Sequence, residues 1–493
     1  MHQVELDGVP VLWEQGPAPL RATLTFGVGG RDESFRTLGV THLVEHLVMG
    51  ALPRVHYETN ASVDLSMTSF TACGRPEQVA QFVTAVCRVL ADLPVDRLTS
   101  EAGVLAAEGG FYAHPTVEAL MYGRFGARGL GLAPYSGPGY DRITAEHVRA
   151  CAGRFFVSGN AVLQLTGPVP DGLRLPLPAG PAPRRERQAA PAVSGPTWAP
   201  AATPGVGAAL LGRRETVWSV GMSVLAERLE AVARHERGLS YEIDGDAVPL
   251  AGEDMLLAIT VDAREGQEAT VAGLLWQQLE ALATDGPTTA DIDHEIGRAR
   301  DMYEDPRYVE VDLAQAAEAV LLGVPYRPRQ QRYEALTQVT AQAVRDRFAA
   351  ALPSVQLVVP DGVRLAIPGV GEGGCPRTAV QPPGRVFKPP LIAKLLARDA
   401  RGRALILMPD GVAQRDPDGD VHVVHWTDVI GVERHDTERV VFGAGGCQVV
   451  VDPELYPGAE KMVAAVDANV PAALCYPRSS LLAPDSPDHR AER

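Results

Sequence analysis

The sequence predicts an α+β protein with two similarly sized α+β domains followed by a small β-rich domain. Three observations predict this fold class. Alternating apolar and polar residues, typical of strands, are interspersed with helical spacing in two long blocks. Two Pro-rich stretches separate these blocks from each other and from a third one. The third block consists mainly of short strand patterns between turn residues.

The Pro-rich stretches set the domain boundaries, because proline removes a backbone donor and resists packing into helices and sheets. The expected parts are a first domain at 1–172, a linker at 173–204, a second domain at 205–367, a linker at 368–384, a third domain at 385–478 and a disordered polar tail at 479–493. The mixture of elements in the first two domains indicates an internal duplication, although no residue-level repeat is visible.

In the first block, strands are expected where apolar and polar residues alternate, and helices where apolar residues recur every three or four positions. Thr41 can cap a helix that Gly50 ends, with an apolar stripe at Leu43, Val44, Leu47 and Val48. The expected strands are Val4–Leu12 around a turn at Gly8, Arg21–Val28 and Ser66–Cys73. The other expected helices are Pro76–Ala91 and Thr99–Glu108.

The second block repeats the mixture. We expect helices at Val217–Arg237 and Glu268–Thr284, a strand at Met255–Val261 and a further helix from about Thr288. In the third block the expected strands are Ala404–Met408, Gly411–Arg415, Val421–Trp426, Val429–Arg434, Arg439–Phe442 and Gln448–Val451, with a closing helix at Ala459–Val470.

Composition narrows the classes of function. The formal charge of −16, from 45 basic and 61 acidic residues, repels polyphosphate and argues against nucleic acid as a partner. No stretch reaches the roughly 18 apolar residues that a membrane helix needs, so we expect no membrane insertion. The start of the chain also lacks signal-peptide features, which makes a cytoplasmic location the default expectation. The six cysteines lack paired spacing, which argues against a disulfide framework and against a thiolate zinc site.

The sequence His42-Leu43-Val44-Glu45-His46 points to metal chemistry. On a helix, its two imidazoles share one face. Imidazole suits zinc, which takes about four tetrahedral ligands and in catalytic sites leaves one position for water, so a third protein ligand is needed. Glu45 can then take a proton from the water that attacks a peptide carbonyl. The alternative is a surface helix with two ordinary histidines.

The wider pattern resembles the start of the insulinase or pitrilysin (M16) family of zinc metallopeptidases, which includes the mitochondrial processing peptidase. Besides the histidine motif, the resemblance is carried by Gly30-Arg31-Asp32-Glu33 and Gly39-Val40-Thr41, and later by Arg154-Phe155-Phe156, Asn160 and Gly167. It implies two homologous domains, each a mostly antiparallel sheet packed with helices. Glu101 and Glu108 match the family's second acidic motif, in which Glu108 is the third zinc ligand and Glu101 supports the site.

The resemblance also implies substrate contacts. Asn60 and Ala61 resemble part of the family's edge strand, which binds an extended peptide by β-augmentation. Arg234 and Tyr241 are similar to its Arg-Tyr signature, whose side chains contact the substrate or the tetrahedral intermediate. The alternative for these two residues is a solvated helix position and a core aromatic. The sequence departs from the family where the segment between Gly50 and Tyr57 is shorter than the resemblance leads us to expect.

These features predict a metalloendopeptidase that hydrolyses extended or unstructured peptides. The family encloses its substrate with four such domains, whereas this chain offers two, so we expect a homodimer or a heterodimer with a related subunit. Two alternatives remain: the catalytic subunit of a heterodimeric peptidase that trims leader peptides, and a non-catalytic peptide-binding or scaffold subunit. The third block looks like a pleckstrin-homology-like domain, for which protein docking or a structural role is expected because basic side chains are few.

Overall fold

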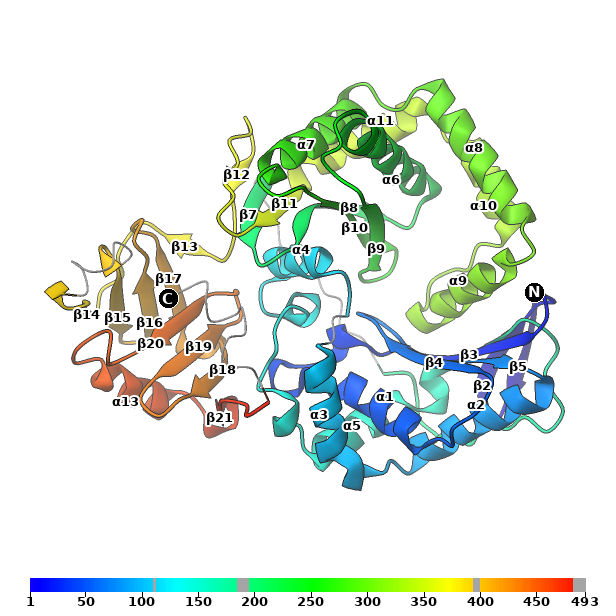
Figure 1. The fold of residues 1–493 in the computed structure, drawn as a ribbon, viewed down its shortest axis with the longest axis horizontal. Coiled ribbons are helices and arrows are strands. Elements are labelled where there is room, and N and C mark those ends of the chain that lie inside the picture. The colour runs from blue at the N-terminus through cyan, green and yellow to red at the C-terminus, as the bar shows by residue number, and fades with distance from the viewer. Residues whose placement is uncertain (110–111, 184–194, 393–399, 482–493) are drawn as a thin grey trace.

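The computed structural model describes residues 1–109, 112–183, 195–392 and 400–481. Figure 1 shows two sheet-and-helix domains, one above the other, and a smaller β-rich domain beside them. The expected α+β fold class is confirmed. Most of the expected tail, 482–493, and residues 184–194 of the first expected linker lie outside the described residues.

The first domain contains a six-stranded sheet in the order β1-β2-β6-β3-β5-β4, in which only β2 and β6 pair in parallel. Its strands are β1 His2–Leu6, β2 Val9–Trp13, β3 Leu20–Phe26, β4 Glu58–Val63, β5 Thr68–Gly74 and β6 Ala161–Leu165. Its helices are α1 Val40–Ala51, α2 Pro76–Ala91, α3 Leu98–Glu108, α4 Pro115–Phe125 and α5 Ala145–Phe155.

The second domain repeats this topology. Its sheet has the order β12-β7-β11-β8-β10-β9, so five of its strands follow the same order and directions as β2-β6-β3-β5-β4. The strands are β7 Thr197–Ala201, β8 Gly205–Arg213, β9 Ile243–Pro249, β10 Asp254–Asp262, β11 Gln356–Pro360 and β12 Gly371–Glu372. The helices are α6 Thr216–Leu229, α7 Glu268–Thr284, α8 Thr289–Glu304, α9 Tyr308–Leu322, α10 Arg329–Thr337 and α11 Ala341–Ala351, with a π-helical turn at Glu230–Glu236 after α6.

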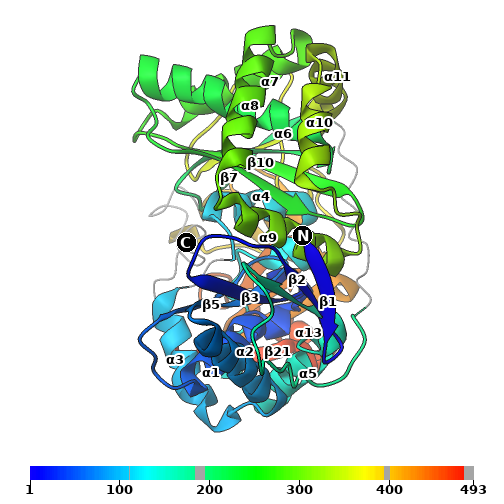
Figure 2. The ribbon, with the colours of Figure 1, turned by 90° about the vertical axis from the view of Figure 1, so that its right-hand side faces the viewer.

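The two sheets face each other, with α4 and α9 between them and the other large helices outside (Figures 1 and 2). In the first domain, apolar residues alternate along β3 and β5, so that one face of the sheet is apolar. Leu24 and Phe70 on this face form a core with apolar residues of α1 and α2, which is why these helices cover the outer side of the sheet. The helices between the sheets are exchanged. Leu120 of α4 packs against the second sheet, and Leu313 of α9 packs against the first. The two domains therefore share apolar cores that neither could complete alone.

In its described residues, the third domain has a five-stranded sheet, β13-β17-β16-β15-β14, a four-stranded sheet, β20-β19-β18-β21, and the helix α13. The elements are β13 Arg377–Thr378, β14 Arg385–Phe387, β15 Ala404–Met408, β16 Gly411–Arg415, β17 Val421–His425, β18 Val429–Arg434, β19 Arg439–Gly443, β20 Gln448–Val451, α13 Glu460–Asn469 and β21 Cys475–Pro477. Phe35, just before α1, packs against Phe442 and Tyr476 and joins this domain to the first.

Both expected linkers contain strands, which corrects those predictions. The stretch 173–204 includes β7, and 368–384 includes β12 and β13. Among the described strands, β12 pairs only with Thr197 and Trp198 of β7. Pro200 lies beyond this short pairing, where β7 has no described neighbour on that side. Proline is tolerated there because no backbone N–H is needed for a ladder hydrogen bond. The helix expected at Pro76–Ala91, in contrast, is observed with the same bounds.

In the part of the chain that the structure describes, no single helix is long and apolar enough to cross a membrane. Only α2 together with residues Val95–Glu108 meets that length-and-composition test, as a pair bent by 79°.

Candidate metal centre

Helix α1 holds the histidine motif rigidly at its start. Its N-cap is Gly39, not Thr41 as expected, and Gly39 has φ +88°, a left-handed conformation in which a Cβ would also lie 2.2 Å from Tyr140. The capping acceptor is instead the carboxylate of Glu33, which accepts the backbone N–H groups of Gly39 at 2.7 Å and Thr41 at 2.8 Å. Thr41 is buried within the first turn. Helix α1 thus begins at a fixed point two residues before His42.

Glu33 is a site-supporting residue whose role the sequence did not reveal, because it lies six residues before the N-cap Gly39 whose backbone N–H it accepts. Its carboxylate also accepts the Tyr112 hydroxyl at 3.0 Å. Burial raises the pKa of Glu33 to about 7, against the hydrogen bonds that favour its charged form.

Helix α3 brings the two acidic residues to α1. Glu101 and Glu108 are two turns apart and lie on one face, and Gly109 ends the helix with φ +65°. Glu101 Oε2 lies 3.7 Å from His46 Nδ1, and Glu108 Oε2 lies 3.2 Å from His46 Nε2. The Arg97 guanidinium holds Glu101 at 2.7 Å. The two carboxylates therefore flank opposite nitrogens of one imidazole.

The ligand-type atoms of His42, His46 and Glu108 all lie within 4.8 Å of one another. This donor set fits zinc: two imidazoles and one carboxylate converge, and the second nitrogen of His46 faces a carboxylate that can fix its orientation. Glu45 Oε2 lies 3.7 Å from Nε2 of both histidines, beside the cluster. The histidine side chains are 16% exposed and that of Glu108 is 52% exposed, so the cluster opens to solvent on the Glu108 side.

Burial and like charges set the protonation of this site. The pKa of Glu45 is raised to about 7, first by burial and then by the nearby Glu108 and Glu101 carboxylates. Burial, followed by the neighbouring His46, lowers the pKa of His42. A lowered pKa keeps His42 neutral at pH 7, which is the form that binds a metal.

Asn60 and Ala61 lie on β4, the terminal strand of the first sheet, next to α1. In the described residues β4 pairs with β5 alone, and side chains along it alternate between exposed and half-buried. An edge of this kind presents backbone donors and acceptors to a further strand.

Arg234 and Tyr241 lie in the second domain, in and after the π-helical turn that follows α6. Figure 1 places α6 in the upper domain and α1 and α3 in the lower one. The Arg234 guanidinium bonds to Glu230 at 2.6 Å and stacks over the Tyr241 ring at 5.1 Å. Tyr241 is 75% exposed, so the alternative of a core aromatic is wrong. These contacts of both side chains stay within the second domain, so the structure does not gather them with the histidine cluster.

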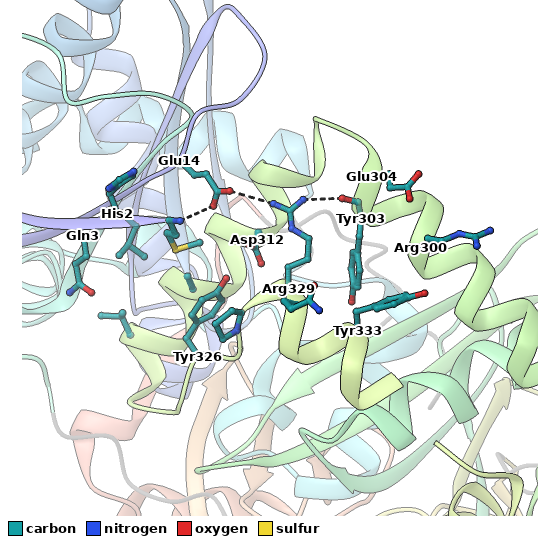
Figure 3. Close-up of a pocket in the computed structure, with 16 residues that line it drawn as sticks. His2, Gln3, Glu14, Arg300, Tyr303, Glu304, Asp312, Tyr326, Arg329 and Tyr333 are labelled. Carbon is teal, nitrogen blue, oxygen red and sulfur yellow. Dashed lines mark hydrogen bonds and ion pairs between the residues drawn. The ribbon is translucent and has the colours of Figure 1, made fainter. Parts of the chain in front are cut away.

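Two cavities are lined partly by residues of the exchanged helix α9. One, of about 710 Å³, lies between the sheets and is lined by hydroxyl groups that project from β3 and β5, namely Thr23, Thr25, Ser69 and Thr71. The other, of about 690 Å³, lies where the N-terminal strands meet α8, α9 and α10, and Figure 3 shows Arg329 bridging Glu14 and the backbone of Tyr303 in it. The residues of the histidine cluster line neither cavity.

No protein-family model and no curated protein sequence matches the chain. Solved structures are similar in fold. A protease from Helicobacter pylori has a TM-score of 0.61 at 13% identity, covering 72% of this chain and 98% of that one. An inactive peptidase M16 domain from Pseudomonas fluorescens has a TM-score of 0.59 at 15% identity, covering 75% and 98%.

The periplasmic protease PqqL from Escherichia coli has a TM-score of 0.57 at 14% identity, covering 89% of this chain and 56% of that one. Pitrilysin has a TM-score of 0.52 at 15% identity, covering 73% and 44%. This chain therefore spans about half the length of these two proteins. At such identities the likeness concerns the fold, and the first two domains of the chain have the fold of M16-type peptidases.

Proposed function

We propose that this protein is a zinc-dependent metalloendopeptidase that hydrolyses extended or unstructured peptides. The observation that carries the proposal is the approach of His42, His46 and Glu108, from two helices, to within 4.8 Å of one another with Glu45 beside them. These three residues would hold zinc, which would supply polarisation of a peptide carbonyl and a lowered pKa of a bound water molecule.

The protein side chains around that position have separate tasks. Glu45 takes the proton of the attacking water at a carboxylate oxygen and delivers it to the nitrogen of the leaving amine, so that the C–N bond breaks. Glu101, held by Arg97, orients His46 through its Nδ1.

Substrate is proposed to bind along β4. This strand is at the edge of its sheet and contacts α1, so a peptide that adds to it as a further strand passes the cluster with its carbonyl groups presented in order. Asn60 and Ala61 provide backbone pairing in this arrangement. Arg234 and Tyr241 are proposed to contact the substrate from the second domain.

A dimer is proposed because the chain covers 56% of PqqL and 44% of pitrilysin. Two copies, or this chain with a related subunit, supply about the length of one of these longer chains. Gel filtration of the isolated protein tests this. A stable, active self-dimer supports the homodimer, and an inactive monomer that a related subunit activates supports a heterodimeric processing peptidase.

The proposed function is tested by comparing zinc content and cleavage of an unstructured peptide in the wild type, His46→Ala and His56→Ala. His56 is a histidine of the same domain outside the cluster. His46→Ala is expected to lower zinc by one equivalent per chain and to abolish cleavage, whereas His56→Ala retains both. Equal zinc and cleavage in all three proteins would refute the proposal.

A second candidate is a peptide-binding subunit without activity. It is favoured by the similarity to a solved domain described as inactive and by the contacts of Arg234, which stay in the second domain instead of reaching the cluster. Peptide binding by the zinc-loaded wild type, with no cleavage in the dimeric state, would support this candidate over the peptidase.

A further inference from the structure

A second cluster of metal-binding side chains lies in the third domain. The ligand-type atoms of Cys375, His422 and Cys447 all lie within 4.8 Å of one another. Cys375 Sγ is 3.1 Å and Cys447 Sγ is 4.0 Å from His422 Nδ1. All six cysteines lie in the described part of the chain, and these two do not form a disulfide.

These spacings match those of zinc ligands. A tetrahedral zinc with Zn–S of about 2.3 Å and Zn–N of about 2.0 Å separates a sulfur from a nitrogen ligand by about 3.6 Å. The two observed sulfur-to-nitrogen distances, 3.1 and 4.0 Å, lie on either side of that value. Two sulfurs and one imidazole are also the ligand types for which zinc competes best against magnesium or calcium.

The surroundings of His422 are those of a metal-binding imidazole. Its Nδ1 faces the two sulfurs, while its Nε2 lies 3.6 Å from Asp416 Oδ2. A carboxylate at the far nitrogen of a ligating imidazole fixes its tautomer and orientation. The His422 side chain is 22% exposed and Cys447 is 4% exposed, so the cluster is largely shielded yet open on one side.

The three side chains come from three separate segments. Cys375 lies in the segment between β12 and β13 (Figure 1). Strand β12 pairs with the sheet of the second domain, and β13 pairs with β17 in the five-stranded sheet of the third domain. His422 is on β17, and Cys447 follows a turn in which the Gly446 carbonyl accepts the Tyr122 hydroxyl of α4 at 2.6 Å. The Cys447 thiol donates to the Pro376 carbonyl at 3.0 Å, so the segment between β12 and β13 already lies against this turn.

We propose that Cys375, His422 and Cys447 bind a zinc ion. This ion fastens the segment between β12 and β13, which connects the second and third domains, to the five-stranded sheet of the third domain. Water or a small exogenous ligand occupies the fourth position, since three protein ligands converge. The site is independent of the peptidase centre, because it shares no residue with it. The spacing of the cysteines in the sequence argued against a thiolate zinc site, but ligands that come from three segments need no paired spacing.

The test uses the full chain with the first centre removed, H42A/H46A, purified with reductant and supplied with Zn²⁺ or Co²⁺. One equivalent of zinc per chain and, with Co²⁺, a thiolate-to-cobalt charge-transfer absorption are expected. Adding C375S/C447S to this background should abolish both, whereas adding C475S, at a cysteine elsewhere in the same domain, should leave both unchanged.

Absence of the charge-transfer absorption in the H42A/H46A chain overturns the proposal without any cysteine variant, so the test does not depend on whether the C375S/C447S protein folds. Loss of two hydrogens from the intact mass of the metal-free H42A/H46A chain, absent when C375S/C447S is added, also overturns it and identifies the pair as a disulfide. Removal of zinc by a chelator should in addition lower the unfolding temperature of H42A/H46A and leave that of the C375S/C447S background unchanged.

Discussion

The two α+β domains have the same strand order but different chemistry. In the first, α1 carries His42, Glu45 and His46 against two carboxylates of α3. In the second, α6 carries Ser219, Met222 and Ser223 at the same i, i+3, i+4 spacing, along a cavity of about 600 Å³. The helices α6 and α8 also bring a histidine to a carboxylate, since His294 Nε2 lies 3.2 Å from Glu227 Oε1.

The duplicated fold therefore supplies positions, and the side chains placed there supply function. His294 is 64% exposed and belongs to neither of the two possible metal-binding clusters found among the described residues. A single exposed pair of this kind binds a metal weakly, whereas the half-buried first cluster offers three ligands. The second domain instead completes the apolar core of the first through α9.

The largest effect should come from Glu45→Gln. Removing the proton acceptor while keeping the ligands should lower kcat by about 10²- to 10⁴-fold, the range for a general base, with zinc content unchanged. Glu227→Gln, on the corresponding helix of the second domain, is the matched control and should retain activity. Comparable losses in both variants would mean that the two domains do not differ as proposed.

How much of the site the sequence could show depends on the distance over which its parts interact. One helix determines the spacing of His42, Glu45 and His46, so this group follows from local periodicity. The part played by Glu101 and Glu108, which are two turns apart on another helix, was implied only by the resemblance. The role of Glu33 as the cap of α1 could not be predicted, because a loop carboxylate that bonds to a helix start several residues later leaves no periodic signal.

The fold was predictable to a similar extent. Strands such as Ala404–Met408 were expected with their observed bounds, because alternation and turn residues mark them locally. The exchange of α4 and α9 between sheets and the strand β7 inside a Pro-rich stretch depend on partners far along the chain. The meeting of Cys375, His422 and Cys447 depends on such partners too.

Glu101→Gln tests the support that the first domain gives to its ligands. The amide keeps the size of the side chain but removes the charge that faces His46 Nδ1 and Arg97, so zinc affinity at this centre should fall by about 10- to 100-fold. Competition with a chelator of known affinity measures it. Glu77→Gln, at an exposed position on α2, is the control, and an unchanged affinity in Glu101→Gln would show that Glu101 does not orient the ligand.

The exchanged helices differ in how they bury a carboxyl group, and pH should reveal it. On α9, Asp312 is paired with Arg332 at 2.5 Å, whereas on α4 the Glu118 carboxylate accepts the backbone N–H groups of Tyr112 and Ala113. Burial raises the pKa of Glu118 from 4.5 to about 8. Between these values the folded state binds one more proton than the unfolded state, so this contribution to stability is complete below about pH 4.5 and is lost as pH rises to about 8.

Glu118→Gln should therefore flatten the loss of stability between about pH 5 and 8, by up to about 1.4 kcal/mol per pH unit. Chemical unfolding at several pH values measures the slope, and Glu146→Gln at an exposed position of α5 should keep the wild-type slope. A wild-type slope in Glu118→Gln would mean that Glu118 is ionised in the folded protein throughout this range.

Tyr241→Phe asks whether the second domain contributes to catalysis at all. The ring is 75% exposed and stacks under Arg234, so removing its hydroxyl should leave the unfolding temperature unchanged. If the hydroxyl donates one hydrogen bond to the substrate, kcat/KM should fall by roughly 2- to 10-fold, the value of a single such bond.

The matched control for this comparison is Tyr57→Phe in the first domain, where the hydroxyl donates to the Gln78 carbonyl at 3.2 Å and so already has a partner within the protein. Steady-state kinetics on one unstructured peptide measures both variants against the wild type. A kcat/KM that falls only in Tyr241→Phe means that the second domain contacts the substrate. Wild-type values in both variants would mean that the Tyr241 hydroxyl does not contact the substrate.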